Sequence, residues 1–201
     1  MDLTNYKDPF DAIFDFETKL AEFTGAPYAV TTDRCTHAIE LCLRYLKWLE
    51  PLEIPAYTYL SVPQTLHKLH IPFEYCNYDW EYEYQMAPSP VWDSARRLEP
   101  NMYRAGQFQC LSFGRGKPLD IGLGGAILTD NKDAYEWLSR ARYDGRDLRD
   151  SPWIEGTISI GYHYYMRPEE CVIANNKLRR KEIFQHNDFS YPDCRSIKWQ
   201  L

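Results

Sequence analysis

Helical and extended hydrophobic patterns alternate along this chain, and that alternation constrains the fold more than any other feature of the sequence. Apolar residues recur at helical spacing over residues 9–24 and 36–49, and short runs rich in β-branched and aromatic residues cover 28–32 and 72–78. Strands that alternate with helices favour a mostly parallel sheet, because each helix carries the chain back across one face of it. We therefore expect an α/β fold in which helices cover a mostly parallel sheet.

The remaining segments continue this pattern without a break that would mark a second domain. Further strands are predicted at 54–59, 90–93, 107–113 and 125–129, and further helices at 61–70, 132–143 and 168–186. Residues 187–201 show no clear periodicity. The 201 residues, 44% of them hydrophobic, are enough to bury one core, so we expect a single domain over 1–201.

The charge balance limits the classes of partner. The chain has 23 basic and 29 acidic residues, a net charge of −6, which argues against general binding to nucleic acid or to an anionic membrane surface. Small molecules or a second copy of the chain are the expected partners. No apolar run approaches the roughly 18 residues of a membrane span, and residues 1–5 lack the basic region and apolar core of a signal peptide, so we expect a cytoplasmic protein.

Neither the cysteines nor the histidines form a recognisable metal site. The six cysteines are scattered with no C-x-x-C spacing, and we expect them to be reduced and mostly buried. His67 and His70 lie three residues apart in a predicted helix, yet no further ligand stands at a matching step nearby. No bound metal is therefore expected.

A glycine-rich stretch between two predicted strands carries the most distinctive chemistry. The sequence SFGRGK at 112–117 ends with Lys117, and residues 122–125 read GLGG. A lysine held in a partly dry pocket can form a Schiff base with an aldehyde, and a nearby hydroxyl with backbone N–H groups can bind a phosphate. The alternative is a solvated loop lysine, which is the commoner state of lysine in general.

Several motifs, taken in order, resemble the DegT-type family of nucleotide-sugar aminotransferases, which are fold type I enzymes that use pyridoxal 5′-phosphate (PLP). The resemblance covers about residues 14–180. The motifs that carry it are FE at 16–17 with FTGAPYAV at 23–30, PAYTY at 55–59, DSA at 93–95, SFGRGK at 112–117 with GGA at 124–126, and GYHYYM at 161–166. The resemblance implies the large domain of that family, a three-layer fold with a mostly parallel mixed sheet covered by helices.

The resemblance also implies the roles of three residues in catalysis and cofactor binding. Lys117 would form the Schiff base with the cofactor and then act as the base that moves a proton. Asp93 would pair with the pyridine nitrogen and keep it protonated, whereas taken alone it is a strand-end cap. Tyr59 would stack on the pyridine face, although a chain with 16 tyrosines leaves a core or surface role as the alternative.

Five further positions correspond to places in the family's cofactor site. Thr36 and Ser112 would donate hydroxyls to the phosphate, and Thr36 opens a predicted helix whose N–H groups favour an anion, the alternative being a simple helix cap. The resemblance places His37 at the cofactor too, with Arg96 where the family commonly has a glutamine that bonds the phenolic oxygen. His163 occupies the place of an asparagine that reaches the phosphate of the neighbouring subunit, and a homodimer is implied.

The sequence departs from the family pattern at four places. Cys35 replaces the glycine of the small-Gly-Thr turn at the phosphate, where Arg34 could supply compensating charge. Arg96 would place a fixed cation at the phenolic oxygen. His163 and Tyr165 alter the cross-subunit part of the site. The chain also ends soon after the last predicted helix, whereas family members continue into a C-terminal small domain that we expect to be absent here.

Three functions remain open from the sequence. The first is a PLP-dependent aminotransferase that moves an amino group from an amino acid, with glutamate as the first candidate, to a nucleotide-linked keto-sugar; Lys117, Asp93, Ser112 and Thr36 support it. The second is a catalytically impaired binding or interaction protein on the same fold, or half of a split enzyme, and the departures support it. The third, an unrelated nucleotide-binding protein, is disfavoured because the lysine motif lacks the earlier glycine and the following Ser or Thr of a P-loop.

Overall fold

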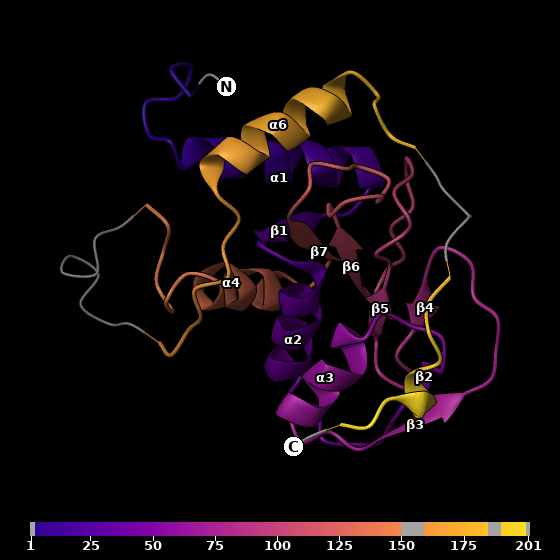
Figure 1. The fold of residues 1–201 in the computed structure, drawn as a ribbon. Coiled ribbons are helices and arrows are strands. Elements are labelled where there is room, and N and C mark those ends of the chain that lie inside the picture. Colours follow the sequence, from indigo (N-terminus) through magenta and orange to yellow (C-terminus); the bar gives the residue numbers. More distant parts are fainter. Residues whose placement is uncertain (1–2, 150–158, 185–189, 200–201) are drawn as a thin grey trace.

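The computed structural model describes residues 3–149, 159–184 and 190–199 of the chain (Figure 1). The strands are β1 (Tyr28–Thr32), β2 (Leu52–Pro55), β3 (Phe73–Cys76), β4 (Tyr84–Gln85), β5 (Val91–Asp93), β6 (Phe108–Ser112) and β7 (Gly125–Thr129). The helices are α1 (Asp11–Thr24), α2 (Cys35–Tyr45), α3 (Ser61–Lys68), α4 (Lys132–Ala141) and α6 (Pro168–Arg179), followed by a short 3-10 helix, η1 (Cys194–Ser196). The alternation of strands and helices predicted from the sequence is confirmed.

The strands form a mixed sheet, as expected, but fewer neighbours are parallel than the sequence pattern predicted. The five-stranded sheet has the order β1-β7-β6-β5-β4, and β2 pairs with β3 in a separate parallel sheet. Among the described strands of the larger sheet, β5 and β6 pair in parallel, while the other three pairings are antiparallel. The reason is the glycine-rich connection at 113–124, which returns the chain as β7 without the crossover helix that a parallel neighbour needs.

The two faces of the sheet bury two separate cores, which gives the expected three layers. Because side chains alternate along a strand, Ala126 faces α1 and α6 while its neighbour Ile127 faces α2, α3 and α4. Leu111 and Cys110 divide between the two cores in the same way. Figure 1 shows α1 and α6 side by side on one face of the sheet and α2, α3 and α4 on the other. Each helix therefore buries its apolar side against strands that also hold the site.

A buried ion pair ties the α1 layer to the sheet. Arg142, directly after α4, is fully buried and pairs with Glu17 of α1. Its guanidinium also donates to the Thr31 carbonyl oxygen at 2.8 Å, and Glu17 accepts from the Thr31 N–H at 2.6 Å. Because the two charges pair with each other and both also bind Thr31, they connect α1 to β1.

Two helices end earlier than their apolar patterns predicted. The helix expected at 36–49 ends at Tyr45, and Lys47 then takes a left-handed backbone with φ of 49°. The helix expected at 168–186 ends at Arg179, and Lys181 is left-handed with φ of 56°. Lysine gives no sequence signal for such a turn, unlike the glycine that ends α1. Residues 185–186 of the second prediction lie outside the described residues.

The segment 190–199, which showed no periodicity, packs beside the loop that follows β2. The Cys194 N–H donates to the Ala56 carbonyl oxygen at 2.9 Å, and the Cys194 thiol contacts the Thr58 carbonyl oxygen at 3.3 Å. Asp193 forms an isolated bridge with Tyr57. These contacts carry Tyr191 to the mouth of the cavity described below. No helix in residues 3–149, 159–184 or 190–199 combines the length and apolar character needed to cross a bilayer.

Candidate active site

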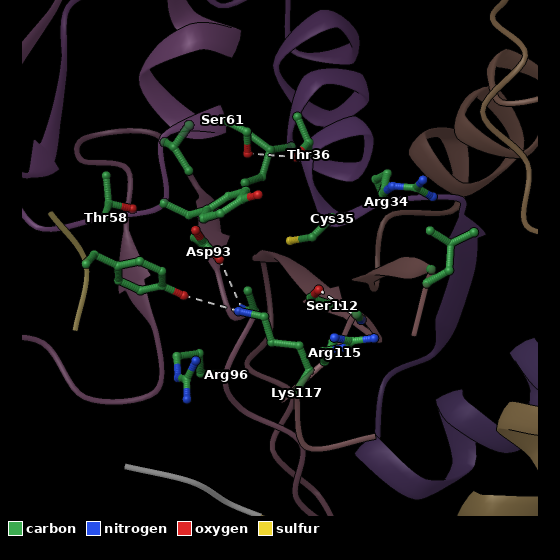
Figure 2. A pocket seen from close by; sticks show the side chains of 18 of the residues that line it. Arg34, Cys35, Thr36, Thr58, Ser61, Asp93, Arg96, Ser112, Arg115 and Lys117 are labelled. Atoms are coloured by element: carbon green, nitrogen blue, oxygen red, sulfur yellow. Dashed lines mark hydrogen bonds between the residues drawn. The ribbon is translucent and has the colours of Figure 1, made fainter. Parts of the chain in front are cut away.

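A cavity of about 410 Å³ opens where β5 and β6 end side by side. Ligands of α/β folds bind beyond the carboxyl ends of parallel strands, and these two are the parallel neighbours of the larger sheet. The wall is built from the N-terminus of α2, residues 58–62, the end of β5 and the glycine-rich connection. Figure 2 shows Lys117, Asp93, Ser112 and Thr36 around the same space, so four of the residues expected at the cofactor are brought together.

Asp93 lies buried at the end of β5, only 6% exposed. Its carboxylate accepts hydrogen bonds of 3.0 Å from the Ala95 N–H and from the Tyr84 hydroxyl. Burial raises the pKa of Asp93, while the charge of Lys117 and these two hydrogen bonds act in the opposite direction. Figure 2 shows the carboxylate directed toward the Lys117 amine. Asp93 thus caps the end of β5 through the Ala95 N–H, and a buried carboxylate that also faces a lysine is a candidate for chemistry.

Tyr84, which does not line the cavity, holds the Asp93 carboxylate in place. The Tyr84 hydroxyl lies 2.6 Å from the Thr58 hydroxyl, and both side chains are buried. Burial raises the pKa of Tyr84 well above its ordinary value, so the phenol stays neutral and donates to Asp93. Since Tyr84 uses its proton on Asp93, Thr58 is the donor to Tyr84. The tyrosine and the short strand β4 that carries it were not predicted from the sequence.

Lys117 projects into the cavity from a loop that Asp120 organises. The Asp120 carboxylate accepts from the N–H groups of Gly116 at 2.7 Å and Gly122 at 2.9 Å. Gly116 has φ of 71°, a left-handed conformation that glycine adopts at no steric cost. The Lys117 amine donates to the Tyr191 hydroxyl at 3.2 Å. Neither Asp120 nor Tyr191 stood out in the sequence.

The opposite end of the cavity is built for an anion. Arg34, Cys35 and Thr36 at the start of α2 line the cavity, and the extended N-cap residue Arg34 provides no side-chain cap within the described chain. The Thr36 hydroxyl lies 2.7 Å from the Ser61 hydroxyl, and Ser112 stands across the cavity on β6. Hydroxyls and helix N–H groups together favour a phosphate.

Cys35 takes an ordinary helical backbone, although the family's glycine at this place suggested that unusual angles would be needed. It is the first residue of α2, and its thiol contacts the Cys110 carbonyl oxygen at 3.4 Å. Burial raises the pKa of the Cys35 thiol well above its ordinary value, so it remains protonated. The glycine that the turn requires lies across from it, because a Cβ at Gly125 would come within 2.5 Å of the Cys35 backbone nitrogen.

We expect Gly125→Ala to destabilise the protein by about 1–3 kcal/mol, the usual cost of overpacking, because the added methyl meets backbone that has to move. Urea unfolding followed by circular dichroism measures this loss. Gly114→Ala is the matched control, since a Cβ there meets only the Ser112 hydroxyl at 3.6 Å. Equal unfolding midpoints for the two variants would show that α2 does not press on β7.

Two of the predicted residues lie outside the cavity. The His37 ring stacks on Tyr164 at 3.7 Å, and its Nδ1 lies 2.6 Å from an Asp33 oxygen. His37 is one residue after Thr36 and therefore points to the neighbouring face of the helix, away from the cavity lining. Its contact with the cofactor stays a prediction. His163 lies 3.2 Å from the Asp144 carboxylate with its side chain 67% exposed. Its contact with a second subunit stays a prediction.

Tyr59 and Arg96 both line the cavity, at different depths. Tyr59 is 54% exposed at the mouth, and its ring meets the Tyr191 ring edge-on at 6.2 Å. Arg96 is 9% exposed, and its backbone N–H donates to the Tyr82 carbonyl oxygen at 3.2 Å. Stacking by Tyr59 and bonding by Arg96 to a cofactor stay predictions, while their places on the wall agree with them.

The described ranges bring together no three histidine, cysteine, aspartate or glutamate side chains that could hold a metal ion. His67 instead packs against Phe73 at 5.1 Å and Trp199 at 5.6 Å. His70 follows the end of α3 with a left-handed backbone, φ of 56°.

Comparison with known proteins agrees with this geometry. The sequence profile of the DegT/DnrJ/EryC1/StrS aminotransferase family matches residues 6–89 and 101–188. No curated protein matches the chain in sequence.

Three solved structures illustrate the likeness in fold. 3-Amino-5-hydroxybenzoic acid synthase has a TM-score of 0.68 at 19% identity, with 85% of this chain and 56% of that chain covered. DesV from S. venezuelae has a TM-score of 0.67 at 16% identity, with 84% of this chain and 56% of that chain covered. Helicobacter pylori PseC has a TM-score of 0.68 at 15% identity, with 84% of this chain and 57% of that chain covered. The chain thus spans a little over half the length of these proteins, and the family profile covers most of it. The chain belongs to the DegT/DnrJ/EryC1/StrS aminotransferase family.

Proposed function

We propose that this protein is a PLP-dependent aminotransferase that moves an amino group from an amino acid, glutamate first, to a nucleotide-linked keto-sugar. The observation that carries the proposal is the buried Asp93 carboxylate facing the Lys117 amine beyond the parallel strands β5 and β6. The substrate class is supported by structural relatives: PseC is an aminotransferase of pseudoaminic acid biosynthesis, and DesI is described with its TDP-sugar product.

The residues around the cavity fit PLP. The volume of about 410 Å³ falls within the usual range of small-molecule sites. One end offers the N-terminus of α2 with the hydroxyls of Thr36 and Ser112, which suits a phosphate. The other end offers the buried Asp93 and Lys117, which suit a pyridine nitrogen and an aldehyde.

When bound, PLP supplies an aldehyde and an electron-accepting ring. Lys117 would be the nucleophile toward that aldehyde, and its free Nζ would later carry a proton between the substrate carbon and the cofactor side. Asp93 would hold a proton on the ring nitrogen through a charge-assisted hydrogen bond. Tyr84 and the Ala95 N–H keep the Asp93 oxygens oriented for this task.

The cavity walls and the surface would complete the site. Ile39 and Val62 are almost fully buried along the wall and would keep water from the reacting atoms. We place the active protein in the cytoplasm as a homodimer, with the exposed His163 as the candidate contact to a second subunit's phosphate.

The test is covalent trapping of the cofactor. PLP added to the purified protein should change its absorbance in the near-ultraviolet to visible range, and borohydride followed by peptide mass mapping should locate the adduct on Lys117. Glutamate should then convert the cofactor to its amine form. Lys132, whose side chain is 71% exposed, is the internal control for non-specific modification. Labelling of Lys132 as extensive as that of Lys117 would contradict the proposal.

A further inference from the structure

A second hollow, of about 320 Å³, adjoins the cavity at its mouth. Its walls are aromatic, with Tyr57, Tyr78, Trp80 and Tyr191, and two carboxylates, Asp79 and Glu81, complete the lining with Ser190. We call it the aromatic hollow. Trp80 and Tyr191 line both spaces, so a molecule in the hollow lies next to the one that reaches Lys117.

The rings of the aromatic hollow are held by the same core that holds Asp93. Trp80 and Tyr191 stack with centroids 5.9 Å apart and planes 15° from parallel. The Trp80 indole N–H donates to the Tyr57 carbonyl oxygen at 2.8 Å, and its ring meets Tyr84 at 5.0 Å. Tyr84 in turn donates to Asp93. The hollow is therefore a preformed continuation of the catalytic cavity.

The chain segment that delivers Tyr191 is also fixed. Cys194 is fully buried between the loop after β2 and the rest of the segment, and its N–H donates to Ala56. The Arg195 guanidinium donates to the Asn77 side-chain oxygen at 2.6 Å and binds Asp193 at 2.6 Å. These contacts tie the segment to the residues that directly precede Tyr57 and Tyr78, so three of the aromatic walls are held together.

The two spaces differ in charge. Among the described residues, the cavity is lined by Lys117, Arg34, Arg96 and Arg115 with one carboxylate, Asp93, whereas the lining of the aromatic hollow has the carboxylates Asp79 and Glu81. Arg195 lies over the Tyr57 ring at 6.0 Å, but its charge is paired with Asp193 at 2.6 Å. An anion such as a phosphate is attracted to the first space and repelled from the second. The hollow therefore suits an uncharged ring.

We propose that the aromatic hollow binds the uncharged sugar ring of the acceptor substrate and that Tyr191 is a specificity-determining residue of this subsite. The proposal rests on the proposed aminotransferase function. A sugar ring has apolar C–H faces that pack on aromatic rings and hydroxyl edges that donate to carboxylates. Because Tyr191 contacts the Lys117 amine, a sugar in the hollow would have its carbonyl near the residue that moves the proton, where the amine form of the cofactor would supply the amino group.

The test compares three probes, UDP, UDP-glucose and UDP-glucuronate, by calorimetry on the PLP-loaded protein. We expect UDP-glucose to bind about tenfold more tightly than UDP, which corresponds to about 1.4 kcal/mol. UDP-glucuronate should lose this advantage because its carboxylate meets Asp79 and Glu81. The double variant Asp79→Asn, Glu81→Gln should restore it.

Two substitutions of Tyr191 separate the ring from the hydroxyl. Tyr191→Ala should remove the tenfold preference for UDP-glucose while leaving UDP binding unchanged, whereas Tyr191→Phe should keep it. Equal affinities of the wild type for UDP and UDP-glucose, or an unchanged preference in Tyr191→Ala, would overturn the subsite. Borohydride trapping on the same samples tests the proposed function separately. An adduct on Lys117 without a preference for UDP-glucose would contradict the sugar subsite alone. A preference for UDP-glucose without an adduct would contradict the cofactor chemistry alone.

Discussion

Lys117→Ala should lose amino transfer by at least about 10³-fold, within the range that a general base and nucleophile supply. The Lys117 amine projects from the glycine-rich connection toward Asp93, and alanine has no side-chain group that could bond the cofactor aldehyde. The measurement is a single turnover with glutamate, followed by the cofactor's absorbance and by the amount of 2-oxoglutarate formed.

Lys117→Arg is the informative companion variant. Its guanidinium keeps a positive charge near Asp93 but stays protonated at neutral pH, so it can serve neither as the nucleophile nor as the base. We expect it to retain PLP binding through the phosphate end and to be as inactive as Lys117→Ala. Lys132→Ala, at an exposed position on α4, should transfer amino groups like the wild type. A Lys117→Ala protein that matches the wild-type single-turnover rate would take the lysine out of the mechanism.

The strands were predictable where the local pattern alone decides. The β-branched and apolar residues of β1 and β7 gave the observed bounds of both strands, because both are buried along nearly their whole length. Strand pairing was harder, since it depends on the loop at 113–124, and the sequence does not show that this loop returns the chain beside β6. The helix ends at Tyr45 and Arg179 were missed because the left-handed lysines that follow them, Lys47 and Lys181, carry no sequence signal.

The site was predictable to the extent that it sits at strand and helix ends. Asp93 and Ser112 end neighbouring parallel strands, so their meeting follows from the fold. Tyr84 and Tyr191 were missed for a different reason, because each reaches the site through tertiary contacts alone. His37 does not line the cavity, because one residue along a helix turns the side chain by about 100°.

Asp93→Asn is expected to lower the rate of the glutamate half-reaction by about 10²–10³-fold, comparable to removing one preorganised electrostatic partner. An amide carries no charge and cannot keep the ring nitrogen protonated, although it can still accept from the Ala95 N–H. Rapid-mixing absorbance after PLP loading measures this rate. Asp120→Asn tests the loop instead of the ring nitrogen, and it should reduce PLP binding more than the rate of the bound form, because Asp120 fixes Gly116 and Gly122.

Asp93→Asn should also make the cofactor-free protein more stable at neutral pH. Burial raises the pKa of Asp93 above its unfolded value, so the folded state holds a proton more tightly than the unfolded state does. The stability from this carboxyl is then fully present below the unfolded pKa, and it falls as the pH rises through the folded pKa. Asparagine stays neutral throughout, so its urea midpoint should exceed that of the wild type at about pH 7, and the difference should shrink toward about pH 4. A midpoint below the wild type's at neutral pH would mean that the ionised carboxylate stabilises the empty site, and that Lys117 and its hydrogen bonds outweigh the burial of Asp93.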